Sequence, residues 1–184
     1  MTRKAFRIAV SGKSGCGNTT VSRMVADTLG LRFINFTFRS LAQEKNLELH
    51  EALALASKDD WWDREVDRRQ VSLAREEGGC VIGSRLAIWM LPEADLKVYL
   101  YAGLETRAQR IVKREGGAFE ETAAFTAERD RQDRERYLRL YGIDNDDYAF
   151  ADLVIDVTSL SPEEIASRIV KRVSPDTSET RDET

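Results

Sequence analysis

A glycine-rich run near the amino terminus is the first part of the chain whose residue types and spacing suggest chemistry. Its residues are Gly12, Lys13, Ser14, Gly15, Cys16, Gly17, Asn18, Thr19 and Thr20, and the first eight follow the pattern G-x-x-x-x-G-x-T. Three glycines let the backbone curl so that successive N–H groups point inward and bind an anion. The hydroxyl of Thr19 is the group expected on Mg²⁺ beside a bound nucleotide. The pattern therefore predicts a P-loop that binds ATP and Mg²⁺.

Position 18 departs from the usual form of this loop, which has lysine there to reach the β- and γ-phosphates. Asn18 keeps an N–H donor but is shorter and uncharged. Removal of one preorganised hydrogen-bond donor that stabilises charge in the transition state typically lowers the rate on the order of 10²–10³-fold. Lys13 is the candidate replacement, because one subgroup of P-loop ATPases carries an additional lysine at this position. The alternative is a solvated Lys13, with the lost charge supplied by arginines elsewhere.

Apolar runs and helical patterns alternate along the chain. Short apolar runs predict strands over 6–11, 32–36, 80–83, 96–101 and 152–157. Helical spacing lies between them, over 19–29, roughly 39–77, 104–114, 120–141 and 162–173. Strands that alternate with helices form parallel α/β sheets covered on both faces. We therefore expect a three-layer P-loop NTPase fold with a five-stranded parallel sheet.

Composition limits the classes of protein to consider. The chain has 184 residues, 42% of them hydrophobic, which predicts one domain over 1–173 with a sizeable core. A net charge of −4 argues against a nucleic-acid polymer as partner. No run approaches the ~20 apolar residues of a membrane span, and Met1 to Lys4 lead straight into the first strand without a signal core. Two cysteines suggest no disulfide framework, so we expect a cytoplasmic protein. Residues 174–184 read as a disordered acidic tail.

Arginines are the second group of candidate phosphate ligands, because a guanidinium binds phosphate oxygens in pairs. Arg129, Asp133 and Arg136 share one face of a predicted helix. Arg85 follows the third predicted strand and Arg39 the second, and open α/β sheets bind ligands at those strand ends. The alternative for each is a structural ion pair. The preceding helix repeats the arginine spacing at Arg107, Arg110 and Arg114.

These residues together resemble a cytidylate kinase of the short type, within the nucleoside monophosphate kinases. The resemblance runs from the first strand to about residue 172 and depends on the order and spacing of several segments. They are 63–70 (DREVDRRQ), 84–87 (SRLA), 92–97 (PEADLK), 128–136 (ERDRQDRER), 151–156 (ADLVID) and 161–164 (SPEE). The chain departs from the pattern at Asn18, at Gly83-Ser84, where many relatives have an acidic residue and then glycine, and at Leu86, where longer relatives have aspartate.

The resemblance implies a core sheet, a helical monophosphate-binding insertion at about 39–77 and a lid at about 115–136. It implies roles for the polar residues as well. The acceptor phosphate or the transferring group would be held by Arg39, Arg85, Arg129 and Arg136, and the acceptor by Asp63, Asp67 and Asp133, of which Asp133 also orients arginines. Arg110 and Arg114 would contact the donor nucleotide.

The function implied is transfer of the ATP γ-phosphoryl group to CMP or dCMP, which gives CDP or dCDP and ADP. Positioning and charge neutralisation would drive it, without a protein nucleophile. Two alternatives remain at this point: a nucleotide-binding regulatory protein with weak or lost transfer, and a P-loop kinase for another small acceptor. We expect a monomer or weak homodimer with no membrane partner.

Overall fold

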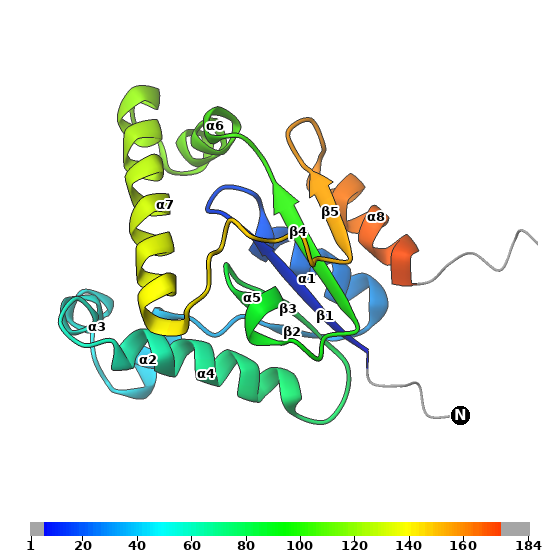
Figure 1. Ribbon diagram of the computed structural model, residues 1–184, viewed down its shortest axis with the longest axis horizontal. Coiled ribbons are helices and arrows are strands. Elements are labelled where there is room, and N and C mark those ends of the chain that lie inside the picture. Colours follow the sequence, from blue (N-terminus) through cyan, green and yellow to red (C-terminus); the bar gives the residue numbers. More distant parts are fainter. Residues whose placement is uncertain (1–5, 174–184) are drawn as a thin grey trace, which may run out of the picture.

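The five apolar runs of the sequence form a single parallel sheet in the computed structural model, which describes residues 6–173 (Figure 1). Its strands are β1 (Arg7–Gly12), β2 (Arg32–Ile34), β3 (Cys80–Gly83), β4 (Leu96–Tyr101) and β5 (Leu153–Asp156). They lie in the order β2-β3-β1-β4-β5, and every neighbouring pair is parallel. The central strand β1 therefore delivers the glycine-rich run to the middle of the carboxyl edge of the sheet.

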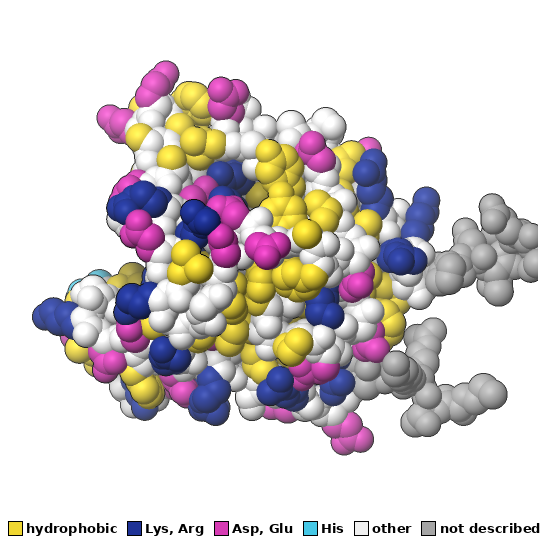
Figure 2. Space-filling model, viewed as in Figure 1, with side chains coloured by type: hydrophobic (Ala, Val, Ile, Leu, Met, Phe, Trp, Pro, Cys, Tyr) yellow, Lys and Arg dark blue, Asp and Glu magenta, His cyan; other side chains and the backbone are white. Residues whose placement is uncertain are grey.

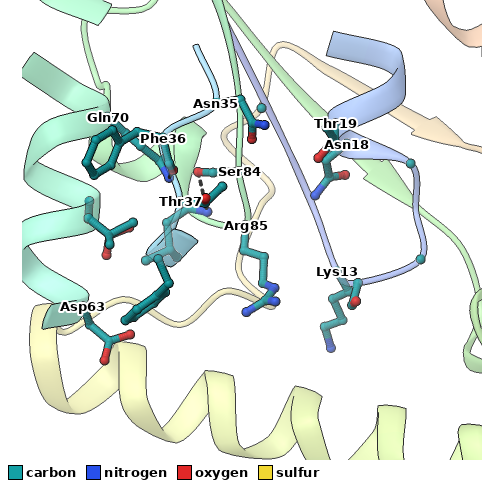
Figure 3. A pocket seen from close by; sticks show the side chains of 18 of the residues that line it. Lys13, Asn18, Thr19, Asn35, Phe36, Thr37, Asp63, Gln70, Ser84 and Arg85 are labelled. Carbon is teal, nitrogen blue, oxygen red and sulfur yellow. Dashed lines mark hydrogen bonds between the residues drawn. The ribbon is translucent and has the colours of Figure 1, made fainter. Parts of the chain in front are cut away.

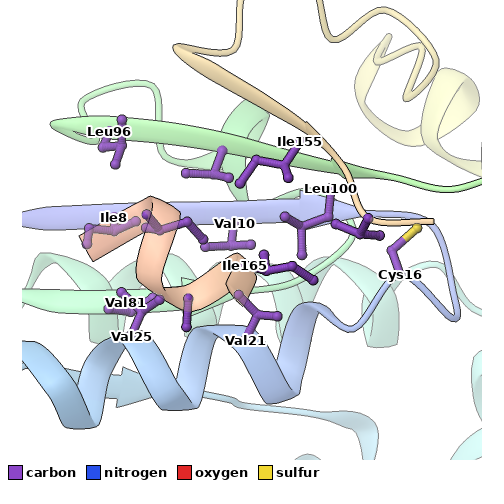
Figure 4. Packing of buried hydrophobic residues seen from close by; sticks show 14 of the residues in the cluster. Ile8, Val10, Cys16, Val21, Val25, Val81, Leu96, Leu100, Ile155 and Ile165 are labelled. Carbon is purple, nitrogen blue, oxygen red and sulfur yellow. The ribbon is translucent and has the colours of Figure 1, made fainter. Parts of the chain in front are cut away.

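Helices cover both faces of the sheet because successive residues of a strand point to opposite sides. Ile8 and Val10 of β1 pack into one hydrophobic cluster with α1 (Asn18–Leu29) and α8 (Pro162–Val173), where Val21 and Ile165 contribute (Figure 4). Ala9, between them, faces a second cluster formed with α4 (Trp61–Arg75) and α5 (Ala87–Met90). The predicted three-layer P-loop fold is confirmed.

The stretch expected to be a helical insertion forms three helices around a small core of its own. They are α2 (Phe38–Glu44), α3 (Leu49–Ala56) and α4. Leu41, Ala52 and Trp62, one from each helix, are buried together there. Thr37 caps α2 in a capping box with Ser40, and this cap fixes where the first helix of the insertion begins. Because α4 also packs on the sheet, the insertion is joined firmly to the core.

The helical patterns expected over 104–114 and 120–141 form α6 (Leu104–Glu115) and α7 (Phe119–Tyr141), which pack against each other. Gly116 and Gly117 join them with positive φ angles. A helix of 23 residues is long enough to carry the arginine face predicted for this segment from one end of the molecule to the insertion (Figure 1). Basic and acidic side chains alternate over α7 in the surface view (Figure 2).

The expected boundaries agree with the structure to within one or two residues for most elements. Exceptions are the helical pattern expected over 39–77, which divides into α2, α3 and α4, and α5, a single turn that the sequence pattern did not indicate. Between residues 6 and 173, no helix is long and apolar enough to cross a membrane. The tail predicted at 174–184 lies outside the described residues.

Candidate active site

The glycine-rich run forms the turn between β1 and α1, as its pattern predicts. Gly15 and Gly17 have φ angles of 87° and 97°, in the left-handed region that glycine adopts without strain. In the described part of the chain no side chain caps the amino end of α1, and its first turn has no acidic residue. Its N–H groups and partial positive charge are therefore available to an anion in the loop.

Asn18 turns back onto the loop. Its Nδ2 donates a hydrogen bond to the carbonyl oxygen of Gly12 at 2.5 Å. Its Oδ1 is buried and has no hydrogen-bond partner among residues 6–173. The amide thus closes the loop at its base, while the ammonium usual at this position is missing.

Arg107 of α6 holds the loop from behind. Its guanidinium donates to the carbonyl oxygen of Ser14 at 3.1 Å and to that of Ala102 at 3.1 Å. It also forms an ion pair of 2.6 Å with Asp130 of α7, and only 5% of the Arg107 side chain is exposed. A Cβ added at Gly15 would lie 2.9 Å from the Cβ of Arg107, so this contact requires glycine. Arg107 stands out in the sequence only by its helical spacing with Arg110 and Arg114. That spacing does not indicate the contact with Ser14, which is 93 residues away in the chain.

Across the site from the loop, Asp133 joins two of the predicted arginines. One oxygen lies 2.8 Å from Arg85, which follows β3, and the other 2.6 Å from Arg136, one turn along α7. Burial lowers the pKa of Arg85, but Tyr137 and Asp133 outweigh it, so the net shift is upward. Tyr137, which the sequence did not single out, also accepts a hydrogen bond from Arg85 at 3.5 Å. Both guanidiniums are therefore charged and fixed.

Arg129 lies next to this cluster, and it forms no ion pair with a carboxylate in residues 6–173. The charge of Arg85, and then burial, lower the pKa of Arg129. It lines a cavity of about 260 Å³ between α6 and α7 together with Ser14 and Arg114. Two neighbouring guanidiniums that repel each other favour an anion between them.

Helix α4 supplies the wall opposite the P-loop, with both aspartates predicted there. Asp63 lies 3.4 Å from Arg136, and burial, partly offset by Arg136, raises its pKa. Asp67 accepts a hydrogen bond of 2.7 Å from the Tyr141 hydroxyl, and burial raises its pKa to about 6. Gln70, within the segment that carried the resemblance, donates to the carbonyl oxygen of Phe36 at 2.7 Å. These groups present hydrogen-bonding atoms of fixed orientation.

A cavity of about 350 Å³ lies between the P-loop and this wall. Figure 3 shows Lys13, Asn18 and Thr19 on one side, Phe36, Asp63 and Gln70 on the other, and Arg85 between them. Its lining also includes Ser14, Gly15, Gly17, Thr20, Asp67, Arg114, Arg136 and Tyr137. Most of the predicted site residues therefore meet in one space.

Six predicted residues do not line that cavity: Gly12, Cys16, Arg39, Arg110, Arg129 and Asp133. Arg129 lines the smaller cavity between α6 and α7, and Asp133 is connected to the main cavity through Arg85 and Arg136. Arg39 is exposed in the first turn of α2 and does not line the cavity, because the chain turns at Thr37 before it. Arg110 donates to the carbonyl oxygens of Val157 and Leu160 instead, beside the loop that follows β5. The Cys16 side chain packs into the hydrophobic cluster, where burial raises the pKa of its thiol (Figure 4).

The residues present fit Mg²⁺ bound through a nucleotide. Thr19 offers a hydroxyl in the cavity, and no group of three His, Cys, Asp or Glu side chains in residues 6–173 forms a metal site. Mg²⁺ commonly takes phosphate and water oxygens with few protein ligands. A carboxylate at position 83 has no room, since a Cβ there would lie 2.8 Å from the Ser22 Cβ and 3.1 Å from the Asn18 carbonyl oxygen.

A model of the cytidylate kinase-like family matches residues 7–159. The chain belongs to this family. It is 50% identical over 164 residues to cytidylate kinase 2 of Borreliella burgdorferi, which covers 87% of this chain and 91% of that protein. It is 45% identical over 165 residues to the cytidylate kinase of Pyrococcus horikoshii, covering 89% and 85%. By family the chain is an ATP-dependent phosphotransferase, and the resemblance seen in the sequence is confirmed.

Solved structures support the same fold. Shikimate kinase from Bacteroides thetaiotaomicron matches with a TM-score of 0.63 over 91% of this chain and 98% of that chain, at 17% identity. At that identity the similarity shows the fold alone, which is that of a P-loop kinase.

The contact of Arg107 with the loop predicts a large effect on stability in this family member. Arg107→Met leaves the Asp130 carboxylate, which is 15% exposed, without its partner, and it leaves the carbonyl oxygens of Ser14 and Ala102 without this donor. We expect the free energy of unfolding in urea to fall by about 3–5 kcal/mol. Arg131→Met, which breaks exposed ion pairs on the neighbouring helix α7, is the control and should cost at most about 1 kcal/mol. Equal losses in the two variants would contradict the buried role of Arg107.

The raised pKa of Asp67 predicts a pH dependence of stability. The folded state holds this proton up to about pH 6, whereas an unfolded aspartate releases it near pH 4. Stability from this group is therefore present at low pH and lost as the pH rises, by roughly 2 kcal/mol between pH 4 and 6. Asp67→Asn should remove that slope from urea titrations, and Tyr141→Phe should extend it to higher pH. A slope unchanged in Asp67→Asn would refute the assignment.

Proposed function

We propose that the chain transfers the γ-phosphoryl group of ATP to CMP or dCMP, giving ADP and CDP or dCDP. The observation that carries the proposal is the single cavity with a P-loop on one side and the cluster of Arg85, Asp133 and Arg136 on the other. The two sides suit a donor phosphate chain and an acceptor phosphate that face each other. The names of the relatives, cytidylate kinase and cytidylate kinase 2, support cytidylate as the acceptor.

In this proposal the protein positions two phosphate groups and neutralises their charge, because phosphoryl transfer needs no protein nucleophile. The loop N–H groups of 12–20 bind the ATP phosphates, with Thr19 on Mg²⁺. Arg85 and Arg136 hold the acceptor phosphate, and Arg129 reaches the transferring group. Arg110 and Arg114 stand on the ATP side. Closure of a lid at 115–136 would exclude water and limit ATP hydrolysis.

The acceptor base would lie against α4. Asp63 and Asp67 line the cavity there, and carboxylates accept hydrogen bonds from the exocyclic amine of cytosine. Uracil has a carbonyl oxygen at that place, which leaves such a carboxylate unpaired. Arg39 is exposed on α2, so it contacts the acceptor only if the insertion moves when the acceptor binds.

Lys13 is the proposed substitute for the missing loop lysine. Its side chain lines the same cavity as Thr19, whereas the Asn18 amide is engaged by Gly12. We propose that the protein works in the cytoplasm as a monomer or weak homodimer. Its two buried cysteines are both free, which suits a reducing compartment.

A coupled assay of ADP release across CMP, dCMP, UMP, AMP and GMP tests the function. We expect ADP release to rise with CMP or dCMP, and Lys13→Ala to lower kcat on the order of 10²-fold by removing a cation from developing charge. Asn18→Lys is the matched variant, since it restores the ammonium at its usual place. If no acceptor raises ADP release, the proposal fails and the chain is a nucleotide-binding protein without transfer.

A further inference from the structure

Lys13 is held by a carboxylate from a distant part of the chain. Its Nζ lies 2.6 Å from Oδ1 of Asp146, in the segment 142–152 between α7 and β5. The Lys13 side chain is 26% exposed and that of Asp146 is 43% exposed. A free lysine loses much rotamer entropy when it binds a ligand. A carboxylate that already fixes the ammonium removes part of that cost.

The carboxylate contacts the ammonium from the side away from the main cavity. Lys13 lines both that cavity and a smaller one of about 210 Å³ beside the end of β4, whereas Asp146 lines only the smaller one. An ammonium has three N–H donors, so one bond to Asp146 leaves two for phosphate oxygens. In Figure 3 the Lys13 side chain extends away from Asn18, to the side of the cavity where Arg85 ends.

The segment that carries Asp146 is itself anchored. Arg134 of α7 donates to both carboxylate oxygens of Asp144, at 2.8 and 2.6 Å. Asp144 in turn accepts a hydrogen bond of 3.0 Å from the Asp146 backbone N–H. On the other side of Asp146, the Tyr148 ring stacks on Tyr99 of β4 with centroids 3.8 Å apart. The position of the Asp146 carboxylate is therefore set by the fold.

We propose that Asp146 is a positioning residue that holds the Lys13 ammonium over the P-loop, in place of the ammonium that position 18 lacks. The inference rests on the proposed function and deepens it. It explains how a flexible lysine at the tip of the loop serves as a fixed cation. It also links the lid helix to the P-loop, because Arg134 of α7 lies 3.6 Å from the other oxygen of Asp146.

A double-mutant cycle tests this role. Wild type, Asp146→Asn, Lys13→Ala and the double variant are compared by two measurements. One is the Kd for MgATP by calorimetry without acceptor, and the other is kcat for CMP-dependent ADP release. Because Asp146 acts through Lys13, we expect Asp146→Asn to raise the Kd about 3- to 10-fold and to lower kcat about tenfold. In the Lys13→Ala background it should change neither.

Asp147→Asn is the matched control, since it removes the same charge from the same segment, at an exposed residue with no ion pair in the described chain. It should leave both quantities unchanged. Tighter MgATP binding in Asp146→Asn would overturn the proposal, because Asp146 would then compete with phosphate. Equal effects of Asp146→Asn with and without Lys13 would overturn it too. If wild type binds MgATP but phosphorylates no acceptor, the proposed function fails, and the binding cycle still decides the role of Asp146.

Discussion

Two carboxylates one turn apart on α7 organise the cations of the site. Asp130 pairs with Arg107, which holds the P-loop through Ser14. Asp133 pairs with Arg85, at the end of β3, and with Arg136, one turn along α7. The guanidiniums of Arg85 and Arg136, which are only partly exposed, would repel each other without Asp133 between them. Helix α7, the P-loop and the end of β3 are thus joined by shared charges.

This arrangement explains how the family member accommodates asparagine at position 18. The cations near the cavity come from the loop tip, the end of β3 and α7, so its positive charge does not depend on one lysine. Asn18 instead bonds the Gly12 carbonyl oxygen and closes the loop. The Oδ1 of Asn18 is buried and has no hydrogen-bond partner among residues 6–173.

The fold followed from the sequence because its signals are local. Apolar runs marked the strands, and Gly30, in the left-handed conformation, ended α1 where the sequence predicted a stop. The single turn of α5 was not predicted, because four residues are too few to show a helical period. Half of the cavity-lining residues also followed from loop spacing and the segment 63–70. The pairings of Lys13 with Asp146 and of Arg107 with Ser14 did not, because they join residues that only the tertiary structure brings together.

We propose that this site, with asparagine in its P-loop, still transfers phosphate because other cations neutralise the charge. Phosphorus-31 NMR of the wild-type protein with MgATP and CMP tests it most directly, by following each phosphate group through a complete reaction. We expect the γ-phosphate signal of ATP to disappear as the signals of CDP and ADP grow together. Loss of γ-phosphate to inorganic phosphate alone, or an unchanged spectrum with bound ATP, would contradict it.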